Sequence, residues 1–173
     1  MGRARPASII SHWDQMIQGM QQSSNEFYAA IDLQLAPHML ADTKTERVNI
    51  AEGGIFSAKR EYLQVRRNEH VFHICAAPFG NGFFVSWWLG EIESGLFATL
   101  AEIPFIGVVV RLFRSAVKPI TYFRVDTALM FQSVTHGAVL AALDEVTTAK
   151  GLKALSELER KPVMRDFFSR IGG

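Results

Sequence analysis

This sequence carries an Asn-Gly pair between two apolar segments, and no other local pattern in it limits the possible folds as strongly. Asn81-Gly82 follows the segment 76–79 and precedes the aromatic run 83–89. Asn and Gly readily adopt the positive φ angles that a two-residue hairpin turn requires. We therefore predict an antiparallel hairpin with its turn at Asn81-Gly82.

The run after this turn has large apolar residues at both odd and even positions, so both faces of the strand should be covered. It is therefore predicted to be a central strand. Three upstream segments rich in Val, Ile, Tyr and Phe are also predicted to be strands: Arg47–Ala51, Lys59–Arg66 and His70–Ala76. The sequence thus predicts a mostly antiparallel sheet of about 4–5 strands.

Helices are predicted at both ends of the chain. Apolar residues recur at three- and four-residue steps over 9–35, which is the helical period, and Ser23 with Glu26 has the spacing of a capping box that starts a second helix. Residues 121–125 are predicted to form a further strand. Asp126 is then expected to cap a long helix over 127–150 that ends at Gly151, and Pro162 is expected to open a short amphipathic helix.

Together these elements predict an α+β fold in which N-terminal helices and a long C-terminal helix cover the sheet. At 173 residues, one domain spanning 1–173 is the expected organisation. The formal net charge of +1 provides no global field for nucleic acid, and the single cysteine, Cys75, excludes an intramolecular disulfide. A cytoplasmic location is expected, with membrane association as an alternative.

The segment 96–117 is unusually apolar, but Glu102 and Pro104 near its middle disfavour a membrane span. A helix starting at Pro104 would carry a basic strip on an otherwise apolar surface. Three interpretations stay open: a core helix with a solvated strip, a partner interface, or shallow insertion into an anionic membrane surface. The predicted interaction surface comprises Arg111, Arg114, Lys118 and Arg124.

Charge is segregated along the chain in a way that favours the interface interpretation. Residues 103–125 contain four basic and no acidic residues, whereas residues 8–43 contain four acidic residues and no Lys or Arg. These segments could pair within one subunit or between two. A protein partner or a homo-oligomer is therefore expected, and nucleic acid is not.

No set of residues with a catalytic or metal-binding spacing stands out. His70 and His73 should point to opposite faces of their strand, so they should not share a metal ion. Cys75 is expected to be a core residue, and Glu91 with Glu93 a solvated rim. His136 is expected to be a surface or packed helix residue, too far from Asp144 along the helix for a direct hydrogen bond. We therefore predict no catalytic residue, no metal site and no cofactor.

The sequence favours a non-catalytic interaction or assembly module that uses the basic and apolar helix surface. The main alternative is a protein that binds an apolar small molecule, with or without catalysis, between the sheet and the helices. The residues expected to line such a pocket are Phe83, Trp87, Trp88 and Phe105. A peripheral membrane protein is the second alternative.

Overall fold

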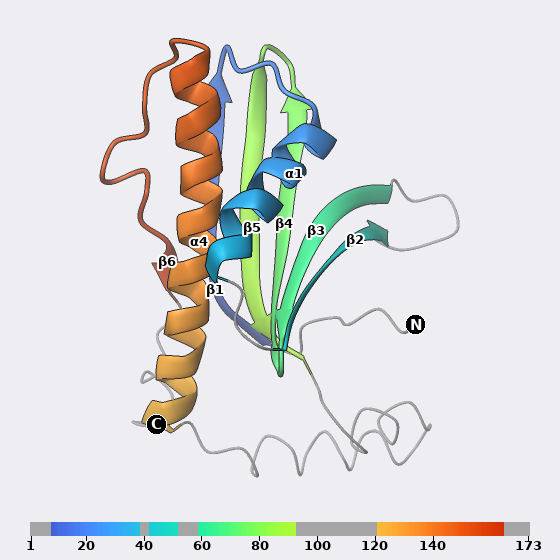
Figure 1. Ribbon diagram of the computed structural model, residues 1–173, viewed down its shortest axis with the longest axis vertical. Helices are drawn as coiled ribbons and strands as arrows, with labels where there is room; N and C mark the ends of the chain where they lie inside the picture. Colours follow the sequence, from blue (N-terminus) through green and yellow to red (C-terminus); the bar gives the residue numbers. More distant parts are fainter. Residues whose placement is uncertain (1–7, 39–41, 52–58, 93–120, 165–173) are drawn as a thin grey trace, which may run out of the picture.

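A computed structural model describes residues 8–38, 42–51, 59–92 and 121–164. Antiparallel strands form one sheet in the order β2-β3-β4-β5-β1-β6 (Figure 1). The α+β class and the long C-terminal helix are confirmed, with 6 strands rather than about 4–5. The elements are β1 Ser8–Gln18, α1 Ser24–Leu35, the short 3-10 helix η1 Ala36–His38, β2 Thr43–Ala51, β3 Lys59–Arg67, β4 His70–Phe79, β5 Gly82–Glu91, α4 Tyr122–Ala149 and β6 Val163–Met164.

The predicted hairpin is β4–β5, but its turn lies one residue earlier than expected. Phe79 pairs with Gly82, so the central turn residues are Gly80 and Asn81, and Gly80 has the positive φ, at 59°. Gly82 instead begins β5, where an added Cβ would lie 2.9 Å from the carbonyl oxygen of Ile17 in β1. Glycine is needed at position 82 for this close approach, and not for a positive φ angle.

The first segment is a strand, so the prediction of a helix before residue 21 was wrong. β1 pairs with β5 over most of its length, and Trp13 and Ile17 are buried while Met16 is partly exposed. The three- and four-residue spacing of its apolar residues arose by coincidence. Pairing with a central strand decides the conformation, because tertiary contacts override a weak local preference.

Helix α1 begins as predicted, with the Ser23 side chain accepting a hydrogen bond from the Glu26 backbone N–H. Its Tyr28 hydroxyl donates to the Glu61 carbonyl oxygen at 2.9 Å and accepts from the Ala76 N–H at 3.0 Å. The β3–β4 ladder ends at the Leu63–Ile74 pair, so this hydroxyl bridges the strands where they separate. Figure 1 shows β2 and β3 bending away from β4 at this end.

Helix α4 starts earlier than the sequence predicted, so the expected strand at 121–125 and the cap at Asp126 were both wrong. Thr121 is the N-cap, and its side chain accepts a hydrogen bond from the Arg124 N–H. The predicted stop at Gly151 is confirmed by its positive φ of 63°. The expected helix after Pro162 is contradicted at Val163–Met164, which pair with β1 as strand β6.

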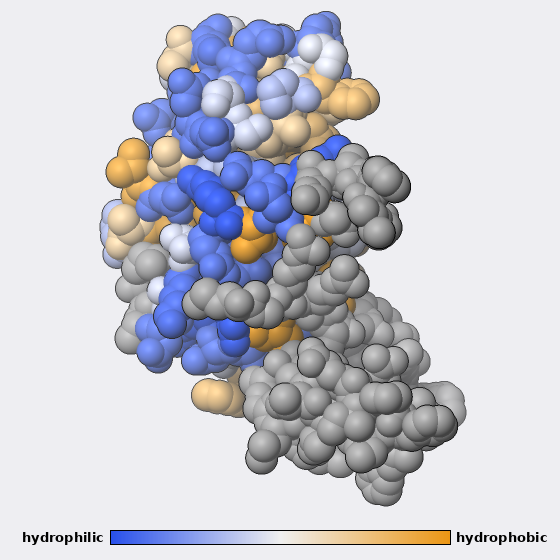
Figure 2. All heavy atoms as spheres, turned by 90° about the vertical axis from the view of Figure 1, so that its right-hand side faces the viewer, coloured by the Kyte–Doolittle hydropathy of each residue, from blue (hydrophilic) through white to orange (hydrophobic). Residues whose placement is uncertain are grey.

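Both helices pack on one face of the sheet, which we call the core face. Phe27 of α1 contacts Phe83 edge-on, and Phe131 of α4 contacts Phe72 in the same way. Strand β5 lies between β4 and β1, which confirms its predicted central position. At one edge, β2 is largely exposed and carries several charged residues, a composition that discourages edge-to-edge pairing. The side of the molecule shown in Figure 2 is correspondingly hydrophilic over much of its described surface.

Candidate functional site

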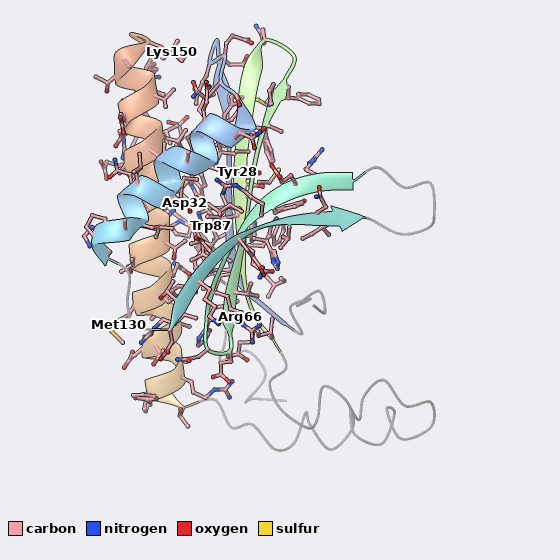
Figure 3. All side chains as sticks on the ribbon, turned by 45° about the vertical axis from the view of Figure 1, so that its right-hand side comes forward. Tyr28, Asp32, Arg66, Trp87, Met130 and Lys150 are labelled. Carbon is pink, nitrogen blue, oxygen red and sulfur yellow. The ribbon has the colours of Figure 1, made fainter. Side chains whose placement is uncertain are left out.

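A pocket of about 480 Å³ lies between the turn joining β3 to β4 and the first turns of α4. We call it the sheet-end pocket. Figure 3 places Arg66 near this end of the sheet, far from Lys150 at the other end of α4. The pocket is lined by Arg66, Asn68, Glu69, His70, Phe123, Arg124 and Thr127. Six of these seven residues are polar or charged, and their carbon atoms contribute apolar surface to the wall together with Phe123.

Ion pairs connect the first turn of α4 to the sheet beside this pocket. The Arg124 guanidinium donates from Nη2 to Glu91 Oε1 at 2.9 Å and from Nε to Glu69 Oε1 at 3.3 Å. Glu69 comes from the β3–β4 turn and Glu91 from the end of β5. All three side chains are partly buried, which reduces solvent screening of their charges.

His70 has a buried nitrogen without a hydrogen-bond partner. Its side chain is 3% exposed, and its Nε2 lies 3.8 Å from Glu91 Oε1, beyond hydrogen-bond distance. Burial lowers the pKa of His70, although Glu91 and Glu69 act in the opposite direction. Buried polar atoms in folded proteins almost always have partners, so this nitrogen marks a position where another group could bind.

Glu69, His70 and Glu91 converge at this point. One ligand atom from each lies within 4.8 Å of the other two. Glu69 was not singled out from the sequence, and Glu91 was expected at a solvated rim but is partly buried and paired with Arg124. The cluster could have been found only from the correct position of the β4–β5 turn, because the observed register pairs His70 with Glu91.

The residues predicted to line an apolar pocket occupy different places. Phe83 and Trp87 are fully buried on the core face. Trp88 is 43% exposed and points to the opposite face, where its ring stacks on His12 with centroids 4.7 Å apart. Phe105 lies outside the described residues. The structure therefore does not bring Trp88 together with Phe83 and Trp87.

Of the predicted interaction surface, only Arg124 is described, and it belongs to the ion pairs above. Arg111, Arg114 and Lys118 lie outside the described residues, as does the whole apolar segment 96–117. None of the described helices is long and apolar enough to cross a membrane.

A buried polar network lies farther along α4. The Trp87 indole N–H donates to His136 Nδ1 at 3.0 Å, and His136 Nε2 lies 2.7 Å from the Arg160 carbonyl oxygen. Since an indole nitrogen only donates and a carbonyl only accepts, His136 must be neutral with its proton on Nε2. The Arg160 guanidinium also donates to both oxygens of Asp144, so Arg160 connects His136 and Asp144, which were expected to be too distant for a direct bond.

His73 and Cys75 lie on the face opposite His70, as the strand period predicted. His73 Nε2 is 3.0 Å from Gln64 Oε1, and Gln64 Nε2 donates to Glu46 Oε1 at 2.6 Å. Burial raises the pKa of the Cys75 thiol, despite the opposing effect of Arg60. A protonated, buried thiol is a poor nucleophile, in keeping with the core role expected for Cys75.

Comparisons with known proteins do not assign this chain to a family. No protein-family profile and no curated protein sequence matches it. A search of solved structures returned the protein TTHA0849 from Thermus thermophilus, with 16% sequence identity and a TM-score of 0.26. The match covers 80% of this chain and 97% of that one.

Proposed function

We propose that this protein binds a small organic molecule with an anionic head group and an apolar body in the sheet-end pocket. The observation that carries this proposal is the buried His70 imidazole, whose Nε2 has no hydrogen-bond partner at the edge of a pocket of about 480 Å³. Ligand sites typically combine a concave surface with a few polar groups of this kind.

The charges of the lining residues favour an anionic head group. The Arg124 guanidinium is already paired with Glu69 and Glu91. Among the described residues, by contrast, Arg66 has no carboxylate partner, and it donates only a long hydrogen bond of 3.4 Å to the Asn68 carbonyl oxygen. A carboxylate could take two hydrogen bonds from this guanidinium.

The apolar part of the ligand would lie against Phe123. This ring lines the pocket and is nevertheless 78% exposed. An exposed aromatic side chain beside polar groups gives apolar area that a ligand can cover.

Three probes with one alkyl chain and different head groups test this proposal: hexanoate, 1-hexanol and hexylamine. Hexanoate should bind most tightly, as measured by calorimetry in the presence of EDTA. Arg66→Gln should weaken hexanoate binding about tenfold, because a charge-assisted hydrogen bond contributes about 1.5 kcal/mol. Arg60→Gln, an exposed arginine on the same strand that does not line the pocket, is the matched control.

The proposal fails if none of the three probes binds. It also fails if all three bind equally and Arg66→Gln changes nothing, because such binding would reflect apolar contact without recognition of an anion.

A second candidate function, self-association, is favoured by exposed apolar residues near the start of α4. Tyr122 is 84% exposed and Met130 is 58% exposed, and Met130 projects from α4 away from the sheet (Figure 3). These residues follow the basic segment that contains Arg111 and Arg114. A second copy of the chain, docking through its acidic residues 8–43, would complement that segment.

Light scattering tests this second candidate. Wild type should self-associate at low ionic strength, and both high salt and the Arg111→Glu/Arg114→Glu double variant should weaken association. A wild type that stays monomeric at low and high salt would remove this candidate.

A further inference from the structure

The cluster of Glu69, His70 and Glu91 at the sheet-end pocket has the composition of a metal site. These residues offer one imidazole nitrogen and two carboxylates, with one ligand atom from each within 4.8 Å of the other two. We propose that they bind a divalent cation of the Zn²⁺ or Mn²⁺ type. This inference deepens the proposed function and rests on it, since it places the cation in the same pocket.

An acidic pair alone would not justify a metal site, because carboxylates often converge without a metal ion. The independent observation is His70, which is 3% exposed and whose Nε2 has no hydrogen-bond partner. A metal ion at this nitrogen would satisfy it, since imidazole is a common ligand of transition metals.

The strand pairing explains why these groups meet. His70 and Glu91 are opposite each other in the β4–β5 ladder, and Glu69 precedes His70 in the adjoining turn. Two ligands are thus positioned by paired strands in the sheet. His70 Nε2 and Glu91 Oε1 are 3.8 Å apart, within the span of two ligands that each lie about 2.0–2.2 Å from one metal ion.

Three protein ligands leave coordination positions open. Zinc sites that act on a substrate keep such a position, whereas structural zinc sites are closed by four protein ligands. Glu69 and His70 also line the sheet-end pocket. An oxygen atom of the bound molecule could therefore complete the coordination.

Arg124 competes with the metal ion for the same carboxylates. Its Nη2 already binds Glu91 Oε1, the oxygen closest to His70 Nε2. Two cations at one carboxylate repel each other, more strongly in a partly buried position than in water. Metal binding would therefore require Arg124 to move away from Glu91, which links the site to the first turn of α4.

This competition between Arg124 and the metal ion can be tested. Metal affinity is measured by calorimetry with Zn²⁺ and by electron paramagnetic resonance with Mn²⁺. The protein is first stripped of metal with a chelator, and no organic ligand is present. Wild type should bind one ion per chain. Loss of a residue that only supports a metal ligand typically lowers metal affinity about 10–100-fold. Glu91→Gln and His70→Ala should lower it by more than this, because they remove ligands. Arg124→Met should tighten it several-fold, an increase that a purely structural role of the cluster does not predict.

Glu145→Gln, the same isosteric change on the exposed far part of α4, is the matched control and should leave metal affinity unchanged. Circular dichroism establishes that each variant is folded, and Glu69→Gln replaces Glu91→Gln if the latter unfolds. Failure of wild type to bind either ion overturns the proposal, as does equal affinity in wild type, Glu91→Gln and Arg124→Met. Hexanoate binding in EDTA is measured separately, so failure of the ligand pocket and failure of the metal site can be distinguished.

Discussion

Trp87→Ala is expected to lower the free energy of unfolding by about 3–5 kcal/mol, as large-to-small changes of a buried aromatic residue do. Trp87 is fully buried, and its ring contacts Phe72 and His136 edge-on. Its replacement would open a cavity in the centre of the core face. It would also leave His136 Nδ1 without the indole N–H that donates to it.

The neighbouring Trp88 is the matched control for this variant. It is the same residue type on the same strand but points to the other face, where it is partly exposed and stacks on His12. Trp88→Ala should therefore cost less than Trp87→Ala, because it removes a side chain that is only partly buried, together with a ring pair worth about 0.5–1.5 kcal/mol beyond its buried area. Urea unfolding of both variants measures the difference, and equal losses would contradict the assignment of the two rings to opposite faces.

Acidification should destabilise the protein below pH about 6.5, the ordinary pKa of histidine. Burial lowers the pKa of His70, His73 and His136 in the folded state. The unfolded chain therefore takes up protons at a higher pH than the folded protein does. The free energy of unfolding is therefore highest above pH about 6.5 and falls as the pH drops toward the lowered pKa values. The loss is about 1.4 kcal/mol per pH unit for each proton that the unfolded chain binds and the folded protein does not.

His136 gives this pH effect a specific test. Protonation at Nδ1 would place its new N–H against the Trp87 indole N–H, so two donors would face each other. His136→Gln keeps one acceptor and one donor but cannot be protonated in this range. Urea unfolding as a function of pH should show a shallower loss of stability for this variant. An unchanged slope would mean that His136 takes no part in the acid sensitivity.

Local signals in the sequence were sufficient for elements whose ends are fixed by their own residues. The Ser23 cap of α1 and the Gly151 stop of α4 were predicted correctly because capping depends on a few neighbouring residues. The same spacing at Ser156 and Glu159 produces the reciprocal hydrogen bonds of a capping box, yet the residues that follow form turns. A capping box therefore predicts a helix only where the residues that follow it can themselves form and pack a helix.

The candidate site could not be predicted because it depends on strand register. A turn centred on Asn81-Gly82 would place His70 opposite Glu93, whereas the observed turn places His70 opposite Glu91. The two registers differ by two residues, so every side chain stays on its predicted face of the sheet. The burial pattern therefore does not distinguish the two registers. In the observed register Gly82 begins β5 and lies against the Ile17 carbonyl of β1, a contact that could not be foreseen because β1 had been predicted to be a helix.

The start of α4 was missed for a related reason. Residues 121–125 include aromatic and β-branched side chains that favour a strand, but Thr121 caps the helix and Arg124 pairs with Glu69 and Glu91. Those partners come from the other side of the pocket and are distant in the sequence. The pocket therefore becomes visible only once the strands and α4 are placed together.

Intermolecular nuclear Overhauser effects between hexanoate and the protein locate the bound molecule and so test whether the sheet-end pocket is a ligand site. Hexanoate alkyl protons should contact the Phe123 ring, and resonances of His70 and Arg66 should shift on binding. Arg66→Gln should reduce the hexanoate contacts at a given concentration, while Arg60→Gln should preserve them. Contacts confined to Trp88 and His12 on the opposite face, or no contacts with Phe123 and no shift at His70, would contradict the account.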